Sequence, residues 1–221
     1  MKYYPVCLDI RDKQCLVVGG GSVATRKVES LLAYSGSVSV VAPTVTETLA
    51  TMAENGRITL ARRGYDATDA DDVFLIIGAT NDARLNRKIK SDADERNILC
   101  NIADFPEACN FILPSVIQRG DFQVTISTAG KSPAFAKHMR KQMETQFGQE
   151  YGVFLDLMGV IRGKLLGETH APEAHKPLFQ RIITGGLLDM IGKREIAQID
   201  ALLTEVLGSG FTLAELGVDL E

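Results

Sequence analysis

The chain of 221 residues has no tryptophan, three histidines and four cysteines, and this scarcity limits the chemistry that it can perform. The cysteines are Cys7, Cys15, Cys100 and Cys109; they form no C-x-x-C pair and have no histidine nearby in the sequence. Metal sites built from cysteine and histidine need such spacings, so we predict no metal site. We expect all four cysteines to be buried as small hydrophobic residues.

Long apolar runs and an excess of basic residues are also absent. No window approaches the roughly 18 consecutive apolar residues of a membrane span, and the opening MKYYPVCLDIRDK lacks the apolar core of a signal peptide. The formal net charge of −4 argues against nonspecific nucleic-acid binding. We therefore expect a cytoplasmic protein that binds neither nucleic acid nor membranes.

Short apolar runs alternate with helical stretches in the first half of the chain. The runs cover residues 15–18, 38–41, 58–61, 73–77 and 98–102. Ala24, Val28 and Leu31 repeat at helical spacing after the first run, and Asp82 opens another helical stretch before the last. Such alternation predicts parallel strands joined by right-handed crossovers. The predicted fold class is α/β, with a Rossmann-like, doubly wound parallel sheet.

The alternation stops near residue 113. FILPSVIQRGDFQVTIST predicts an antiparallel hairpin around Gly120, and Ser132 and Pro133 then begin a helix as N-cap and first helical residue. From residue 148 the pattern is helical to the end, with breaks near THAPEAHKP and at Gly208. We predict three parts: a dinucleotide-binding domain (1–113), a hairpin-plus-helix segment (114–147) and a helical domain (148–221).

The segment VVGGGSVA fits the pattern G-x-G-x-x-A directly after a predicted strand and at the head of a predicted helix. Gly19 permits a tight turn, Gly21 leaves space for a pyrophosphate, and Ala24 keeps the helix close to the sheet. The helix N-terminus supplies N–H groups and the positive end of the helix dipole. This context predicts a bound dinucleotide.

An acidic residue that binds the adenosine ribose usually ends the second strand of such a domain. Here Ala42, Pro43 and Thr44 follow that strand, and the nearest carboxylate is Glu47. No arginine stands there for a 2′-phosphate, so these residues favour a nicotinamide cofactor without deciding between NAD and NADP. Backbone atoms around Pro43 and Thr44 are the remaining candidates to hold the ribose.

Two further loops follow strands at the same predicted edge of the sheet. Thr80 and Asn81 follow the fourth strand in GATND and belong either beside the cofactor or in an ordinary loop, while Asp82 is expected to cap the next helix. Asp104 follows the fifth strand in CNIADFPEACN. A carboxylate there is suited to act as a general base during hydride transfer; the alternative is a turn residue.

The order of four motifs closely resembles the precorrin-2 dehydrogenase family. The motifs are VVGGGxVAxRK, GATND, CNxxDxPxxxxFxxPS and STxGxSPxxAxxxR, and the matching residues are 19–27, 78–82, 100–115 and 127–140. In some members the same module is also a sirohydrochlorin ferrochelatase, and it forms the N-terminal half of siroheme synthases. The resemblance is strong over residues 1 to about 150 and extends to the helical remainder only by size and position.

The resemblance implies NAD-dependent oxidation of precorrin-2 to sirohydrochlorin, either alone or together with insertion of Fe²⁺ to make siroheme. It implies that Asp104 serves both reactions and that NAD contacts Ser22 and Val23, as well as Pro43 and Thr44. It also implies a homodimer in which residues 114–147 exchange across the interface. Where some siroheme synthases carry a phosphorylated serine, this chain has Thr128.

Precorrin-2 carries many carboxylates, so its pocket is expected to be locally basic. Lys131, Lys137 and Arg140 lie on and before one predicted helix, whose N-terminus at Ser132 also favours anions. We therefore predict that Thr128, Lys131, Ser132, Lys137 and Arg140 bind the substrate. The alternative is an ordinary solvated helix face.

Two other functions compete with this interpretation. One is an oxidoreductase for another small substrate, and the other is a ligand-sensing NAD(P)-binding Rossmann module in which the nucleotide changes assembly. The sensor is expected to carry an acidic residue after the second strand and to lack a substrate-lining hairpin, and this chain has the reverse pattern.

Overall fold

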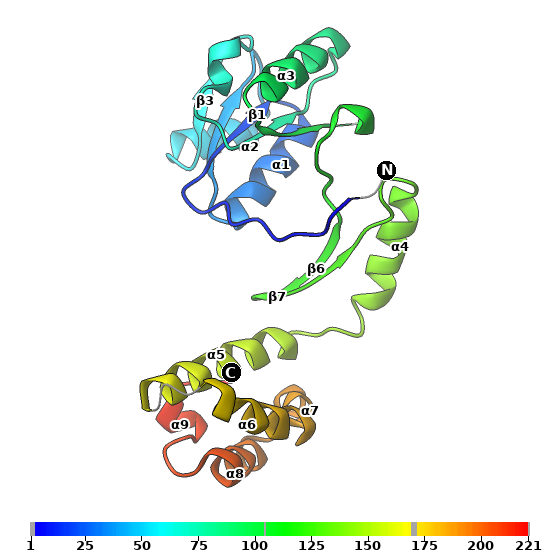
Figure 1. Cartoon of the computed structure of the whole chain (residues 1–221). Helices are drawn as coiled ribbons and strands as arrows, with labels where there is room; N and C mark the ends of the chain where they lie inside the picture. Colours follow the sequence, from blue (N-terminus) through cyan, green and yellow to red (C-terminus); the bar gives the residue numbers. More distant parts are fainter. Residues whose placement is uncertain (1–2, 104, 169–171, 221) are drawn as a thin grey trace. The chain divides into compact units, whose positions relative to one another are not determined.

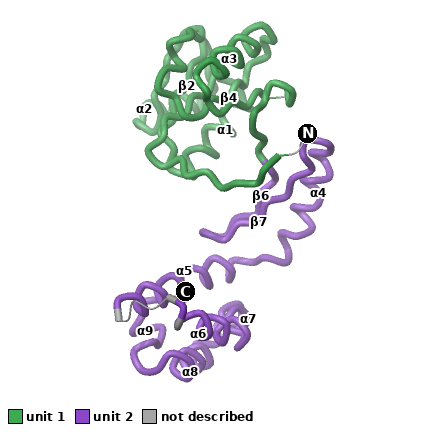
Figure 2. The backbone as a smooth tube through the Cα atoms, in the orientation of Figure 1, with its two compact units in different colours: residues 1–113 green, residues 114–221 purple. Residues whose placement is uncertain are grey.

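The computed structural model describes residues 3–103, 105–168 and 172–220. Its chain forms two compact units, residues 1–113 and residues 114–221 (Figure 2). None of the described helices is long and apolar enough to cross a membrane.

The first unit, drawn in blue to green in Figure 1, contains a parallel β-sheet. Its five strands follow the order β3-β2-β1-β4-β5. The strands are β1 (Gln14–Val18), β2 (Ser37–Val41), β3 (Thr59–Ala61), β4 (Leu75–Gly78) and β5 (Leu99–Ile102). The order reverses between β1 and β4, and ligands of such sheets bind beyond the carboxyl ends of the strands at this point. The predicted doubly wound fold is confirmed.

Helices cover both faces of this sheet. α1 (Ser22–Ala33) and α2 (Glu47–Glu54) bury Ala24, Val28 and Leu49 against one face. The 3₁₀ helix η1 (Ala67–Ala70) and α3 (Ala83–Glu95) bury Ala70, Ile89 and Ala93 against the other. A second 3₁₀ helix, η2 (Pro106–Ala108), follows β5. The sequence pattern did not predict α2, which begins after its N-cap Thr46.

Cysteine burial differs from the prediction at one position. Cys15, Cys100 and Cys109 are buried in the first unit, as expected for small hydrophobic residues. Cys7 is exposed, because the segment before β1 forms no strand or helix that would cover it.

The second unit begins with the predicted antiparallel hairpin. β6 (Ser115–Arg119) and β7 (Phe122–Ile126) pair around a turn in which Gly120 has a φ of +54°. α4 (Pro133–Met143) follows, and the side chain of Ser132 accepts a hydrogen bond from the backbone N–H of Phe135 over 3.2 Å. Ser132 therefore caps the helix and Pro133 opens it, as predicted.

The remaining helices share a second core. They are α5 (Glu150–Glu168), α6 (Pro172–Thr184), α7 (Leu187–Lys193), α8 (Ile196–Leu207) and α9 (Leu213–Leu216). Leu157, Ile182 and Leu203 are among the residues fully buried between them. The rings of Phe122, Phe147 and Tyr151 also pack together, which joins the hairpin to the start of α5.

The predicted break near THAPEAHKP coincides with the boundary between α5, which ends at Glu168, and α6. The chain is already helical at Pro172, so most of the APEAHKP stretch belongs to α6, with Pro177 inside it. Two breaks were not predicted, at Gly186 with a φ of +87° and at Arg194 with a φ of +57°. The predicted break at Gly208 is confirmed. A separate helical domain from residue 148 onward stays a prediction.

Candidate functional site

Each of the three adjacent glycines after β1 has a different environment. Gly19 has a φ of +128°, and an added Cβ would overlap the carbonyl oxygen of Ala79. An added Cβ on Gly20 would overlap the carbonyl oxygen of Thr44, whereas one on Gly21 would meet no atom within 4 Å. The first two glycines therefore allow close packing of backbone on backbone, and the third leaves open space for a ligand.

The N-terminus of α1 opens beside this space. Gly21 is its N-cap and provides no side-chain cap. Within the described part of the chain, no acceptor bonds to the backbone N–H groups of Ser22, Val23 and Ala24. Such unpaired donors, together with the helix dipole, favour an anion. Ala24 itself is fully buried and lets α1 lie close to the sheet, so these residues fit the pyrophosphate of a dinucleotide.

The loop after β2 is tied to the glycine loop. The N–H of Thr46 donates to the carbonyl oxygen of Gly20 over 2.9 Å, and the hydroxyls of Thr25 and Thr46 lie 2.9 Å apart. Pro43 and Thr44 are exposed at this edge of the sheet. Gly20 was not among the predicted site residues. Its place between two predicted site glycines was the feature of the sequence that could have indicated its role.

The loop after β4 is shaped by a buried amide. Thr80 Oγ1 donates to Asn86 Oδ1 over 2.7 Å, and Asn86 Nδ2 returns a bond of 3.1 Å to the Thr80 carbonyl. Asn86 is only 8% exposed, and the sequence analysis did not identify it as a residue that shapes the site. Its position beside Leu85, on the apolar face of a predicted helix, was the feature of the sequence that could have indicated a buried polar contact. The hydroxyl of Thr80 thus holds its own loop, and Asn81 is exposed next to it.

Asp82 caps α3, as predicted. Its Oδ1 accepts the backbone N–H groups of Arg84 and Leu85 over 2.8 and 3.1 Å. The bond from Leu85 and, to a smaller extent, the bond from Arg84 stabilise the carboxylate and so hold the pKa of Asp82 below its usual value. The carboxylate is therefore engaged by the helix rather than by a ligand.

The predicted base, Asp104, lies outside the described residues. The chain on either side of it is anchored to the sheet. The N–H of Ala103 donates to the carbonyl oxygen of Gly78 over 2.8 Å, and Cys109 Sγ accepts the N–H of Ile102 over 3.2 Å. Burial raises the pKa of the Cys109 thiol, so this sulfur stays protonated and neutral.

The predicted substrate residues all belong to the second unit, whereas the described cofactor residues belong to the first. The turn before α4 is closed by Thr128, whose carbonyl accepts the N–H of Lys131 over 3.0 Å and whose Oγ1 accepts that of Ser132 over 3.1 Å. Lys131 and Lys137 are exposed. Arg140 forms an ion pair of 2.7 Å with Glu144, so part of its charge is already compensated.

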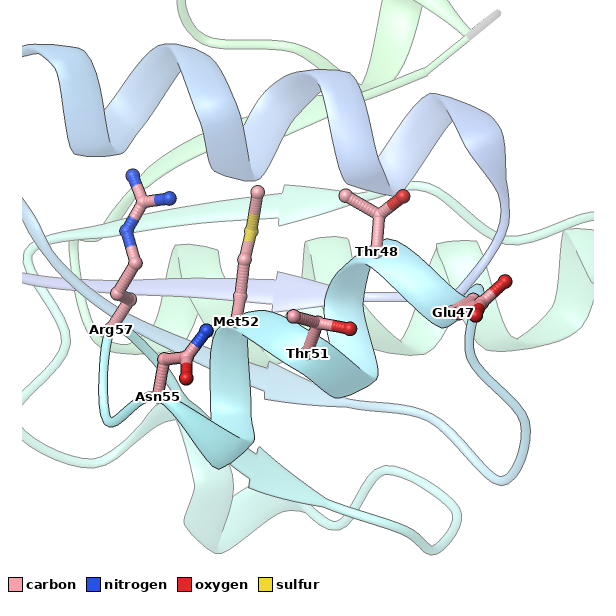
Figure 3. A pocket seen from close by; sticks show the side chains of 6 residues that line it. All are labelled: Glu47, Thr48, Thr51, Met52, Asn55 and Arg57. Atoms are coloured by element: carbon pink, nitrogen blue, oxygen red, sulfur yellow. The ribbon is translucent and has the colours of Figure 1, made fainter.

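A hollow also lies along α2 (Figure 3). It is lined by Glu47, Thr48, Thr51, Met52, Asn55 and Arg57. None of the predicted cofactor residues lines it. Because Glu47 begins α2 directly after the loop that follows β2, the hollow starts beside that loop and extends away from it along α2.

Two family models match consecutive parts of the chain. Residues 6–115 match the family described as "Putative NAD(P)-binding", and residues 119–146 match the family described as "Sirohaem biosynthesis protein central". The first match spans β1 to β5 with the loops after β1, β2 and β4 at their carboxyl ends. The second begins at Arg119, the last residue of β6, and covers β7 and α4. The first unit is therefore an NAD(P)-binding domain.

The chain is similar over most of its length to siroheme synthases. That of Nitrosococcus oceani is 34% identical over 211 residues, which are 96% of this chain and 45% of the relative. That of Thioalkalivibrio sulfidiphilus is 34% identical over 219 residues, which are 98% of this chain and 44% of the relative. The chain thus spans less than half the length of these siroheme synthases.

The chain is also similar to a solved structure over nearly its whole length. That structure is described as SirC, precorrin-2 dehydrogenase, and it superimposes with a TM-score of 0.75 at 26% identity. The match covers 92% of this chain and 98% of that chain, so it includes the helical region that no family model covers. With these similarities and the glycine-loop geometry, the chain belongs to the family of precorrin-2 dehydrogenases and siroheme synthase N-terminal modules.

Proposed function

We propose that the protein is a precorrin-2 dehydrogenase of siroheme biosynthesis, which oxidises precorrin-2 to sirohydrochlorin with NAD⁺ as the hydride acceptor. One observation carries the proposal: open space at Gly21 lies beside the unpaired N–H groups of α1, in a chain that joins an NAD(P)-binding domain to a sirohaem-biosynthesis segment. The likeness to SirC over 98% of that chain supports the same reaction.

In this proposal the described loops bind the cofactor, and Asp104 takes part in the chemical step. The N–H groups of Ser22 and Val23 bind the pyrophosphate, and backbone atoms of Pro43 and Thr44 hold the adenosine ribose. The bound dinucleotide supplies the acceptor for the hydride. Precorrin-2 loses two hydrogens, one as that hydride and one as a proton, and we assign the proton to the carboxylate of Asp104. Conjugation in the macrocycle extends as they leave, so the main task of the protein is to position the reactants.

The carboxylates of the tetrapyrrole are assigned to the turn and helix of the second unit. Lys131 and Lys137 are exposed cations, and Ser132 opens α4 with its positive dipole end. Arg140 must exchange its bond to Glu144 for a substrate carboxylate, which makes its contribution smaller than that of the two lysines. Thr128 shapes the turn through its bond to Ser132, and its hydroxyl hydrogen remains able to donate to the substrate.

We also propose a homodimer formed through residues 114–147. The proposal rests on the family resemblance, and Phe135 on α4, which is 56% exposed, is an apolar side chain that such a contact would cover. Insertion of Fe²⁺ into sirohydrochlorin is a further activity of some family members. Asp104 is the candidate to receive the displaced pyrrole protons there.

The decisive experiment is a spectrophotometric assay with precorrin-2 and NAD⁺, followed by addition of Fe²⁺. Absorbance of sirohydrochlorin reports the dehydrogenase, and its conversion to the siroheme spectrum reports the chelatase. Absence of sirohydrochlorin from an enzyme that binds NAD⁺ would contradict the proposed function.

Variants of Asp104 test the role of the base. Asp104→Ala is expected to bind NAD⁺ normally and to lose precorrin-2 oxidation by about 100-fold or more, the usual range for a general base. Glu107→Gln is the matched control, because Glu107 is an exposed carboxylate in the adjacent η2. Turnover of Asp104→Ala close to that of Glu107→Gln would refute the assignment.

A further inference from the structure

The end of β3 carries an arginine that the proposed function does not use. Arg62 directly follows β3 and is exposed. Its neighbour Arg63 donates to both carboxylate oxygens of Asp69, over 2.8 and 2.5 Å. In the described ranges no carboxylate forms an ion pair with Arg62. The charge of Arg62 is therefore available to a ligand.

The sheet places Arg62 beside the loop that follows β2. β2 and β3 pair in parallel with Val41 opposite Ala61. The pairing continues one step further, because the N–H of Ala42 donates to the carbonyl oxygen of Ala61 over 3.1 Å. Arg62 thus stands abreast of Ala42, immediately before the Pro43-Thr44 stretch assigned to the adenosine ribose.

The same stretch lacks the group that would exclude a phosphate. Sites that select NAD place a carboxylate at the end of β2, where it binds the ribose 2′-hydroxyl and repels a 2′-phosphate. Sites that take NADP place an arginine nearby, whose planar guanidinium binds phosphate oxygens in pairs. Here Pro43 and Thr44 occupy the position of the acid, and the nearest carboxylate along the chain, Glu47, begins α2.

We propose that Arg62 is a specificity-determining residue that binds the 2′-phosphate of NADP, so that this site accepts NADP as well as NAD. The inference rests on the proposed function, since the same loops hold the rest of either dinucleotide. Glu47 is exposed and opposes the interaction through its negative charge. Arg62 supplies the cation that the end of β2 lacks.

The test is equilibrium binding of NAD⁺ and NADP⁺ to the full chain, measured by titration calorimetry without tetrapyrrole. Arg62→Ala is expected to weaken NADP⁺ binding about tenfold, as for loss of one charge-assisted hydrogen bond, and to leave NAD⁺ binding unchanged. Glu47→Gln is expected to strengthen NADP⁺ binding alone. Arg57→Ala is the matched control and should alter neither affinity, because Arg57 is also exposed but precedes β3 at its opposite end.

Several outcomes separate this inference from the proposed function. Unchanged NADP⁺ affinity in Arg62→Ala, or an equal loss for both dinucleotides, overturns the role of Arg62. A wild-type protein that binds NAD⁺ but not NADP⁺ overturns it as well and leaves the proposed function intact. A wild-type protein that binds neither dinucleotide overturns the proposed function itself. Added salt should weaken NADP⁺ more than NAD⁺, since only the former carries the 2′-phosphate charge.

Discussion

Gly20 and Gly21 are neighbours in the glycine loop, yet alanine is expected to damage different properties at the two positions. A Cβ on Gly20 would overlap the carbonyl oxygen of Thr44 and would lie 2.9 Å from Val45 Cα. These are backbone atoms that cannot rotate away. Gly20→Ala must therefore displace the loop after β2, and overpacking of this kind lowers the free energy of unfolding by about 1–3 kcal/mol.

Gly21 has no such neighbours. Its φ of −84° and ψ of −174° are accessible to any residue, and nothing lies within 4 Å of an added Cβ. Gly21→Ala is therefore expected to leave the free energy of unfolding within about 0.5 kcal/mol of the wild type. The methyl group would instead occupy the space assigned to the pyrophosphate, so NAD⁺ affinity should fall by about tenfold or more.

Denaturant titrations with and without NAD⁺ measure both properties in one assay. A ligand at 100 times its Kd stabilises a folded protein by about 2.7 kcal/mol. At the NAD⁺ concentration that produces this effect in the wild type, a tenfold weaker Gly21→Ala should show about half of it, or about 1.4 kcal/mol, and less if its affinity falls further. Its midpoint in the absence of NAD⁺ should be unchanged. Gly20→Ala should already unfold at lower denaturant without NAD⁺.

Two results would refute this reasoning. Equal destabilisation by the two substitutions would mean that Gly21 also packs against protein. Wild-type NAD⁺ affinity in Gly21→Ala would mean that the pyrophosphate does not approach the chain at this glycine.

Two other predictions concern charge. Lys137→Glu should raise KM for the tetrapyrrole several-fold without altering NAD⁺ affinity. Lys193→Glu, on the exposed surface of α7, is the control and should change neither quantity. An unchanged KM in Lys137→Glu would mean that Lys137 is an ordinary solvent-exposed residue that does not bind the substrate. Burial raises the pKa of the Cys15 thiol from its ordinary value of 9.0 to about 11, and that of the Cys100 thiol to about 12. The folded pKa of each thiol exceeds its unfolded pKa, so the folded state favours the neutral thiol. The contribution of these thiols to the free energy of unfolding is therefore complete below pH 9.0 and is lost as the pH rises through the folded pKa values. The denaturant midpoint should fall over this window, less steeply in Cys100→Ala, and a flat midpoint would contradict the burial argument.

The strands of the first unit were predictable because a parallel sheet covered on both faces needs continuous apolar runs. Residues such as Val17 and Ile76 face opposite cores, and both are fully buried. α2 was not predictable in the same way, since it is only eight residues long and buries just Leu49 and Met52. A short helix with two buried residues leaves little periodicity to detect.

The sequence predicted which segments form the cofactor site better than it predicted the contacts between them. The glycine pattern located the loop, but the close packing of Gly20 on Thr44 joins two separate segments, and no local pattern contains such a contact. The bonds between Thr80 and Asn86 span only six residues, but a polar side chain on the apolar face of a predicted helix does not show which partner it binds. In the second unit, the sequence predicted a break near THAPEAHKP but not where the next helix begins. α6 begins at Pro172, and proline suits the first position of a helix because no N–H is needed there.

The bonds between the glycine loop and the loop after β2 bear on how the cofactor is received. Because Thr46 is bonded to Gly20 and its hydroxyl to that of Thr25, the backbone that meets the phosphates and the backbone that meets the ribose are already fixed to each other. Ordering a loop during association costs conformational entropy, and here folding has already met that cost. The dinucleotide therefore encounters a preorganised template. Thr46→Val removes the hydroxyl contact with Thr25 but keeps the backbone bond to Gly20, so it is expected to loosen the link between the two loops without separating them.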